Sequence, residues 1–288
     1  MIKYYTRACN FYYGNISKEK VKNKISFPLN GNKLISFDTI ELITRKKKKV
    51  IKIRDIRKLP SKIKKKVLKD LNQIVKVKKI LKIKFKTPPL LMGILNATPD
   101  SFSDGGKYLK SSSAYKQIKK LNKDGADIID IGGESTRPNS DTIDNLTEWN
   151  RIKSKLKYAK KNKIIVSLDT RKSYILKKSL PFKINLLNDV SGLNHDIKMI
   201  NVLKVSKVPF VLHHIQGTPK TMQKNPKYQN VILDIYDFFE KKLKYLRANK
   251  INHKNIILDP GIGFGKNLKH NLKLIKNISI YHSLGLPI

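Results

Sequence analysis

The sequence predicts an α/β protein built as a TIM (β/α)8 barrel, with about six βα units visible and a small N-terminal extension before them. From residue 87 onward, short apolar runs alternate with longer amphipathic stretches. This pattern is typical of parallel strands buried on both faces and covered by helices. A polar or glycine-rich cluster follows nearly every apolar run. Many consecutive strands with such ends favour a barrel, because an open sheet uses only a few strands at its switch point.

The six expected strands are short and continuously apolar, and they span residues 90–95, 126–131, 164–168, 184–187, 208–212 and 256–258. The stretches expected to be helical are 112–123, 148–161, 173–180, 197–205 and 231–249. Closure of the barrel needs two more strands. We therefore expect a domain of residues 87–288 that lacks the last two βα units. Because six strands leave two edges unpaired, we expect residues 1–288 alone to be unstable or inactive.

A different pattern precedes the breaker at Thr87-Pro88-Pro89, where residues 1–86 are basic and carry no chemical motif. Residues 33–45 are rich in β-forming side chains and predict a strand or hairpin. Apolar residues at helical spacing follow Pro60, with lysines between them. We expect this helix to pack its apolar side on the same chain rather than on a membrane or partner. Residues 1–86 are thus expected to form a basic extension of unknown role.

The net charge of +41 points at first to nucleic acid, but lysine is spread over nearly every segment. We interpret this as compositional bias and do not expect a nucleic-acid site. No apolar run approaches the roughly 18 residues of a membrane span, and the N-terminus lacks the apolar core of a signal peptide. Cys9 is the only cysteine, which excludes an intrachain disulfide. We expect a cytoplasmic protein without a membrane partner.

Two loops after the first two strands carry residues that can bind phosphate and metal. The first, 95–106, reads LNATPDSFSDGG, and its carboxylates suit Mg²⁺ bound together with substrate phosphates. The second, 132–138, reads GGESTRP and offers the planar fork of Arg137 to phosphate oxygens. Simpler interpretations stay open: the first is an ordinary polar turn, and Glu134 is a buried partner for a backbone amide.

Asp169, Asn188 and Asp259 each stand at the end of their own strand. Together they suit a flat heterocycle with a ring amide and an amino group, because a carboxylate can grip two N–H groups at once. One such Asp is usually a cap, but three at strand ends call for partners, since buried carboxylates are costly alone. His213 and His214 are adjacent on a strand and point to opposite faces, so a zinc pair is not expected.

Six motifs occur in a fixed order over residues 88–288: MGILNATPDSFSDGG at 92–106, GADIIDIGGESTRP at 125–138, SLDT at 167–170, NDVSG at 188–192, HHIQGTPKTMQ at 213–223 and DPGIGFGKN at 259–267. In this order they resemble the dihydropteroate synthases. The resemblance implies a TIM barrel, usually homodimeric, acting in tetrahydrofolate synthesis. In the family's reaction, 6-hydroxymethyl-7,8-dihydropterin diphosphate loses pyrophosphate. The amine of p-aminobenzoate takes its place and gives 7,8-dihydropteroate.

The resemblance assigns pterin recognition to Asp169, Asn188 and Asp259, and counts Asp169 among the catalytic residues. It places Asn96 and Asp100 at Mg²⁺, the expected cofactor, and at the pyrophosphate.

The resemblance also assigns roles to the two loops. Thr136 and Arg137 are expected to hold the diphosphate, with Arg137 catalytic. Phe102, Pro138 and Thr136 are expected to shape the p-aminobenzoate pocket, where sulfonamides compete. Asp104 is expected to face the cationic intermediate, also as a catalytic residue.

The chain departs from the family pattern at two places. His213 stands where the family has a Met, and Ile215 replaces a second Met. The family's later S-R-K and R-x-H segments do not occur within residues 1–288. Alternatives are therefore an inactive remnant of the family or a pterin-binding methyltransferase domain, although those domains lack the first two loops. A basic nucleic-acid binder is the alternative from another class.

Overall fold

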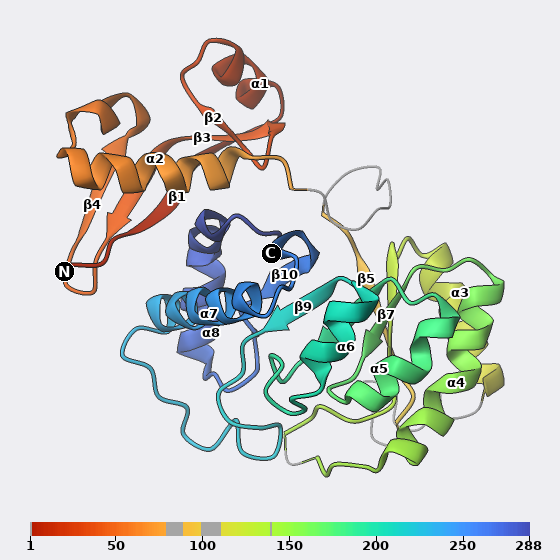
Figure 1. Ribbon diagram of the computed structural model, residues 1–288. Helices are drawn as coiled ribbons and strands as arrows, with labels where there is room; N and C mark the ends of the chain where they lie inside the picture. Colours follow the sequence, from red (N-terminus) through yellow and green to blue (C-terminus); the bar gives the residue numbers. More distant parts are fainter. Residues whose placement is uncertain (1, 79–88, 99–110, 139) are drawn as a thin grey trace. The chain divides into compact units, whose positions relative to one another are not determined.

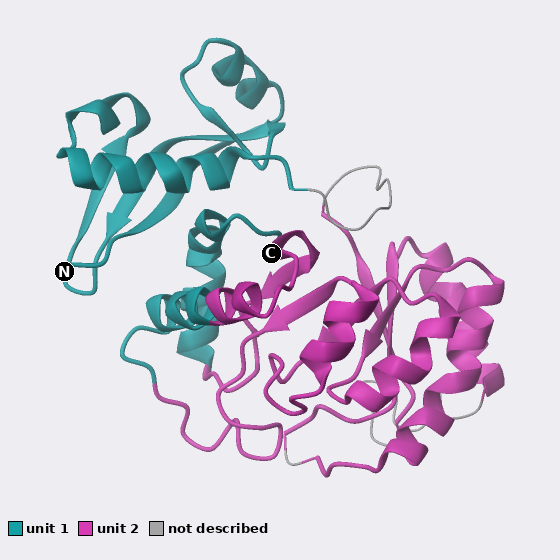
Figure 2. Ribbon diagram, in the orientation of Figure 1, with its two compact units in different colours: residues 1–80, 228–241, 268–288 teal, residues 81–227, 242–267 magenta. Residues whose placement is uncertain are grey.

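The computed structural model describes residues 2–78, 89–98, 111–138 and 140–288. The chain divides into two compact units (Figure 2). Unit 1 contains residues 1–80, 228–241 and 268–288, and unit 2 contains residues 81–227 and 242–267. The expected boundary between residues 86 and 87 lies outside the described residues. The assignment of 1–86 and 87–288 as separate domains stays a prediction.

Unit 2 is built on a parallel sheet whose six strands follow one another in chain order (Figure 1). This confirms the predicted α/β class with six βα units. Within the described part of the chain, β5 and β10 each pair with one strand only. The strands are β5 (Met92–Asn96), β6 (Ile128–Gly132), β7 (Val166–Asp169), β8 (Leu186–Asp189), β9 (Phe210–His213) and β10 (Ile256–Asp259).

Helices connect these strands and pack in sequence, α3 on α4, α4 on α5 and α5 on α6 (Figure 1). The central residues of β6, β7, β8 and β9 are almost fully buried, as their continuous apolar runs predict. In β5, by contrast, Ile94 is 62% exposed, so this strand is not buried on both faces as predicted. Asp144 caps the N-terminus of α4 by accepting from the backbone amides of Leu146 and Thr147. This cap starts the helix three residues before the predicted position. The helices are α3 (Ser111–Lys123), α4 (Asn145–Lys161), α5 (Ser173–Ser179) and α6 (Met199–Ser206), with 3₁₀ turns η2 (Leu180–Phe182) and η3 (His253–Asn255).

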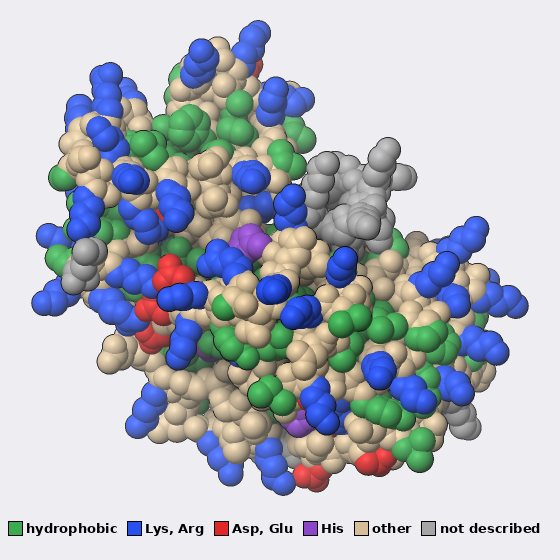
Figure 3. Space-filling model, in the orientation of Figure 1, with side chains coloured by type: hydrophobic (Ala, Val, Ile, Leu, Met, Phe, Trp, Pro, Cys, Tyr) green, Lys and Arg blue, Asp and Glu red, His purple; other side chains and the backbone are tan. Residues whose placement is uncertain are grey.

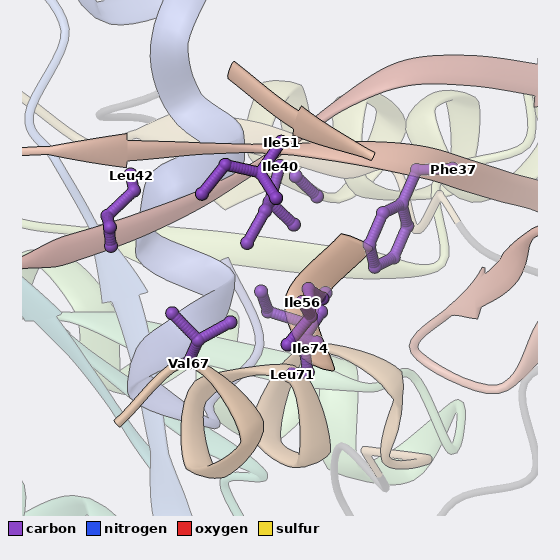
Figure 4. Packing of buried hydrophobic residues seen from close by; sticks show 9 residues of the cluster. Phe37, Ile40, Leu42, Ile51, Ile56, Val67, Leu71 and Ile74 are labelled. Carbon is purple, nitrogen blue, oxygen red and sulfur yellow. The ribbon is translucent and has the colours of Figure 1, made fainter. Parts of the chain in front are cut away.

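The N-terminal part of unit 1 is an antiparallel sheet in which β3 pairs with β1, β2 and β4. The apolar side of α2 packs on this sheet through Val67, Leu71 and Ile74, against Phe37 and Ile40 (Figure 4). This confirms the strands within 33–45 and the helix that packs on its own chain. The elements are β1 (Tyr5–Tyr13), α1 (Gly14–Lys22), β2 (Phe27–Leu29), β3 (Asn32–Ile43), β4 (Lys48–Lys52), η1 (Ile53–Lys58) and α2 (Ser61–Val75).

Unit 1 also contains three later pieces: the first part of α7 (Val231–Ala248), α8 (Leu268–Asn277) and η4 (Ile278–Leu284). The ring of Tyr5 meets the ring of Tyr236 edge-on, with centroids 5.1 Å apart. The Ser279 hydroxyl donates to the backbone oxygen of Ala8 at 2.9 Å. The N-terminal sheet is thus joined to segments more than 200 residues further along the chain.

Lysine and arginine side chains are scattered over the visible face of both units instead of gathering on one patch (Figure 3). This distribution agrees with the interpretation of the charge as compositional bias. No helix within the described ranges is long and apolar enough to cross a membrane.

Candidate active site

The carboxyl ends of four neighbouring strands form one row across unit 2. Asn96 lies opposite Gly132, Gly132 opposite Asp169, and Asp169 opposite Asn188. Residues in one row of a parallel sheet project to the same side. The polar residues at the ends of these strands therefore project to one side of the sheet.

Asp259 projects to the same side of the sheet, two residues beyond this row on β10. The row that contains Asn188 continues through Val211 of β9 to Ile257 of β10. Since side chains two residues apart share a face, Asp259 faces the same side as Asn188. Its carboxylate oxygen Oδ1 accepts from the backbone amide of Gly261 at 2.7 Å, which fixes its orientation.

Gly132 leaves room for the carboxyl group of Asp169. A Cβ atom at position 132 would lie 2.9 Å from Oδ2 of Asp169 and 3.2 Å from its Cβ. Contacts this short would push the carboxyl group out of the row. The Asp169 carboxyl group can therefore keep its place only with a glycine at position 132.

Sequence reasoning missed Asp130, which it counted within an apolar run. Asp130 precedes Gly132 by two residues and is only 5% exposed. Its Oδ2 accepts from Nδ2 of Asn188 at 3.0 Å. The sequence does contain a sign of its role, since a carboxylate in the middle of a buried strand needs a polar partner.

Burial raises the pKa of the Asp130 carboxyl group, and the nearby Ser167 hydroxyl and the hydrogen bond from Asn188 oppose that shift only in part. Burial also raises the pKa of Asp169 well above its usual value, and the nearby carboxylates, Asp130 first, raise it further. The site thus gathers carboxyl groups whose negative charges oppose one another.

The loop after β6 is anchored from below through Glu134. This buried carboxylate accepts from the backbone amide of Ile143 at 3.0 Å, from Nε of Arg171 at 2.7 Å and from Nζ of Lys172 at 3.0 Å. The interpretation of Glu134 as a partner for a backbone amide is therefore right. Burial alone would raise the pKa of Glu134, but these donors outweigh it and lower the pKa.

Lys172 links Glu134 to a second buried acid, Glu148, at 2.7 Å. The hydroxyl of Thr170 donates to the other oxygen of Glu148 at 2.6 Å. Above this network the loop presents Thr136 and Arg137 as partly exposed side chains, and Pro138 as an exposed one. The network holds the base of the loop, so the phosphate-binding candidates stand on a supported backbone.

The two histidines diverge, as predicted. His213 contacts the backbone oxygen of Val190 through Nδ1 at 2.9 Å, and its Nε2 lies 3.9 Å from Oδ2 of Asp259. His214 instead contacts Nζ of Lys266 through Nδ1 at 3.1 Å. Burial lowers the pKa of His214 to about 3 and that of Lys266 to about 7. In the described part of the chain, no three His, Cys, Asp or Glu residues form a metal-binding group.

Three of the predicted site residues, Asp100, Phe102 and Asp104, lie outside the described residues. Their predicted roles at Mg²⁺, at p-aminobenzoate and at the cationic intermediate stay predictions.

Sequential parallel strands that gather amide and carboxylate groups at their carboxyl ends define a barrel-type α/β enzyme. The sequence model of a family described as pterin binding enzyme matches residues 92–288. The chain therefore belongs to the pterin-binding enzyme family.

Its relatives narrow this assignment to the dihydropteroate synthases. The chain is 37% identical over 202 residues to dihydropteroate synthase of Haemophilus influenzae, covering 69% of this chain and 73% of the relative. It is 40% identical over 205 residues to that of Neisseria meningitidis serogroup B, covering 69% and 72%. These likenesses confirm the predicted family and its synthase function, and they favour a synthase over a methyltransferase domain.

Solved structures of the family agree in fold. The Yersinia pestis dihydropteroate synthase in a sulfonamide complex matches with a TM-score of 0.67 at 37% identity, covering 69% of this chain and 72% of that one. The Xanthomonas albilineans enzyme with 4-aminobenzoic acid matches with a TM-score of 0.62 at 31% identity, covering 69% and 71%.

Proposed function

We propose that this chain catalyses the condensation of 6-hydroxymethyl-7,8-dihydropterin diphosphate with p-aminobenzoate. The products are 7,8-dihydropteroate and pyrophosphate, which makes the protein a transferase of folate biosynthesis. Detectable turnover by residues 1–288 would therefore overturn the expectation that they are inactive alone. The observation that carries the proposal is the shared row of Asn96, Asp169 and Asn188, with Asp259 on the same side of the sheet.

In this proposal the pterin lies against Asp169, Asn188 and Asp259. The pterin edge presents an amino group and ring N–H groups, which are donors. Carboxylate and amide oxygens are the matching acceptors, and two oxygens of one carboxylate can take two parallel N–H groups. The fixed Asp259 carboxylate and the space that Gly132 leaves for Asp169 support this assignment.

The diphosphate is proposed to lie at the ends of β5 and β6. Asn96 and Asp100 would hold Mg²⁺, and oxygen ligands of this kind fit an ion that usually takes one or two protein ligands plus substrate phosphates. When bound, the ion supplies positive charge to the leaving pyrophosphate. Arg137 would grip the same oxygens with its planar fork, and Thr136 would donate its hydroxyl.

The second substrate is proposed to enter beside the two loops. The C–O bond to pyrophosphate breaks, a C–N bond to the p-aminobenzoate amine forms, and the amine loses a proton. Asp104 would face the cationic carbon, because a nearby carboxylate lowers the energy of developing positive charge. Phe102, Pro138 and Thr136 would enclose the aromatic ring, and sulfonamides would compete for that pocket.

A homodimer, as is usual in the family, and a cytoplasmic location belong to the same proposal. Residues 1–86 are proposed to be a basic N-terminal extension with no catalytic residue of their own.

The proposal is tested with the purified chain, both substrates and Mg²⁺, by measuring pyrophosphate release and dihydropteroate formation. Asp169→Asn is expected to lower turnover by at least about a hundredfold, through lost pterin contacts and lost placement of the reacting carbon. Asp141→Asn, an exposed carboxylate paired with Lys220, is the matched control and is expected to change nothing. A folded chain that neither turns over nor binds the pterin diphosphate would overturn the proposal and favour an inactive family member.

A further inference from the structure

We infer that Asp130 is a positioning residue that sets the orientation of the Asn188 side-chain amide, so that its carbonyl oxygen stays available to the ligand. The inference rests on the proposed pterin role of Asn188 and deepens it. Asp130 sets what kind of group Asn188 recognises, and it does not itself touch the ligand.

The first observation is the place of Asp130 in the sheet. Asp130 lies opposite Ser167 in β7, one step below the row of Gly132, Asp169 and Asn188. Because residues two apart share a face, its side chain projects to the same side as the proposed pterin contacts. The Asp130 side chain therefore lies directly beneath Asp169 and Asn188. Asp130 is buried, whereas Asp169 and Asn188 are partly exposed.

Asp130 and Asn188 meet across an intervening strand. Asn188 stands on β8 and Asp130 on β6, with β7 between them. In a (β/α)8 barrel, the inward side chains of alternate strands pack together in one layer. Asn188 and Asp130 meet in this way, with Nδ2 of Asn188 at 3.0 Å from Oδ2 of Asp130.

In the contact between Asn188 and Asp130, the amino group of the Asn188 amide donates and Oδ2 of the carboxyl group accepts. The amide is planar, and directing Nδ2 toward Asp130 turns Oδ1 away from it. An Asn without such a neighbour presents its donor or its acceptor with little preference. Asp130 thus commits Asn188 to accept from a ring N–H or amino group of the heterocycle.

A double-mutant cycle tests the inference, with binding of 6-hydroxymethyl-7,8-dihydropterin diphosphate to the full chain measured by calorimetry. Asp130→Asn keeps the shape of the side chain and removes the obligatory acceptor. We expect it to weaken binding by about tenfold when Asn188 is present. In the Asn188→Ala background the same change is expected to alter binding by less than about twofold, because there is no amide left to orient.

Asp70→Asn controls for the loss of a buried carboxylate, since Asp70 is also buried and accepts from a hydroxyl group, that of Thr6. It is expected to lower the melting temperature and leave binding unchanged. Wild-type affinity for the pterin diphosphate in Asp130→Asn overturns the inference. An equal loss of affinity with and without the Asn188 side chain also overturns it, because Asp130 would then be a direct ligand contact or a general structural residue. Unchanged binding in Asn188→Ala alone would instead refute the proposed pterin role of Asn188.

Discussion

Nε of Arg171 donates to Oε2 of Glu134 at 2.7 Å and so joins the loop after β6 to the loop after β7. Both side chains are buried, and Lys172 completes the arrangement by bridging Glu134 to Glu148. Two bases and two acids are thus held together beneath the loop that carries Arg137. The charge balance of this group is a condition for the loop to keep its conformation.

Replacing Glu134 should therefore affect both stability and phosphate binding. Glu134→Gln leaves Arg171 and Lys172 with one buried acid between them, and breaking a buried ion pair in this way costs about 3 kcal/mol. We expect that loss in urea unfolding and a raised KM for the pterin diphosphate, because Arg137 loses its support. An unchanged KM in a folded variant would show that the loop does not depend on this anchor.

A second prediction concerns Gly261, which has a φ of +70°. A Cβ atom there would collide with the backbone oxygen of His214 and lie 3.0 Å from Cε1 of His213. Gly261→Ala is expected to destabilise the chain by about 3 kcal/mol, from backbone strain and crowding together.

Gly263→Ala is the matched control for this substitution. Gly263 also has a positive φ, of +85°, but a Cβ atom there meets no atom within 4 Å. Its expected cost is about 1 kcal/mol, which is the strain of the left-handed conformation alone. Equal melting temperatures for the two variants would contradict the crowding at Gly261.

The pH dependence of stability should report on Asp189. Burial raises the pKa of this carboxyl group to about 6 in the folded chain. In the unfolded chain its pKa is about 3.9. The folded state then holds the Asp189 proton more tightly than the unfolded state does, which stabilises the fold. This stabilisation is complete below pH 4 and is lost as the pH rises toward 6.

Asp189→Asn removes this titration. Between pH 4 and pH 7 we expect the free energy of unfolding of the variant to fall by about 2–3 kcal/mol less than that of the unmodified chain. Denaturant melts at closely spaced pH values measure the difference. Parallel curves for the two proteins would mean that Asp189 keeps an ordinary pKa when folded.

A fourth prediction concerns Asp237, which joins the N-terminal sheet of unit 1 to α7. Its carboxylate meets Nζ of Lys3 at 2.6 Å, Nη2 of Arg45 at 2.6 Å and the hydroxyl of Tyr5 at 2.9 Å. Asp237→Asn is expected to cost about 1–2 kcal/mol and to speed proteolysis of residues 1–80, with a smaller effect in high salt.

Glu240→Gln provides the comparison, because Glu240 is more exposed and its described ion pair is with Lys3 alone. Exposed pairs contribute about 0–1 kcal/mol, so protease resistance should hardly change. If both variants are cleaved at the same rate, the cluster around Asp237 does not fasten the N-terminal sheet.

Much of the fold follows from local pattern. Continuous apolar runs predict all six strands of unit 2, because parallel strands buried on both faces leave no alternation. The helix after Pro60 follows from its spacing of apolar residues. Helix α8 and strand β4 were not predicted, since lysines interrupt their apolar residues. Strand β1 was not predicted either, because Thr6, Arg7 and Asn10 break its apolar pattern.

The sequence by itself determined the family, the strand order and the polar end of each strand, because these depend on neighbouring residues and fixed motifs. Only the tertiary structure decided that Asp130 meets Asn188, that Glu134 meets Arg171, and that the sheet of β1 and β3 packs with residues 268–288. Such contacts join residues far apart in the chain. They depend on strand register and side-chain direction, which composition and spacing do not encode.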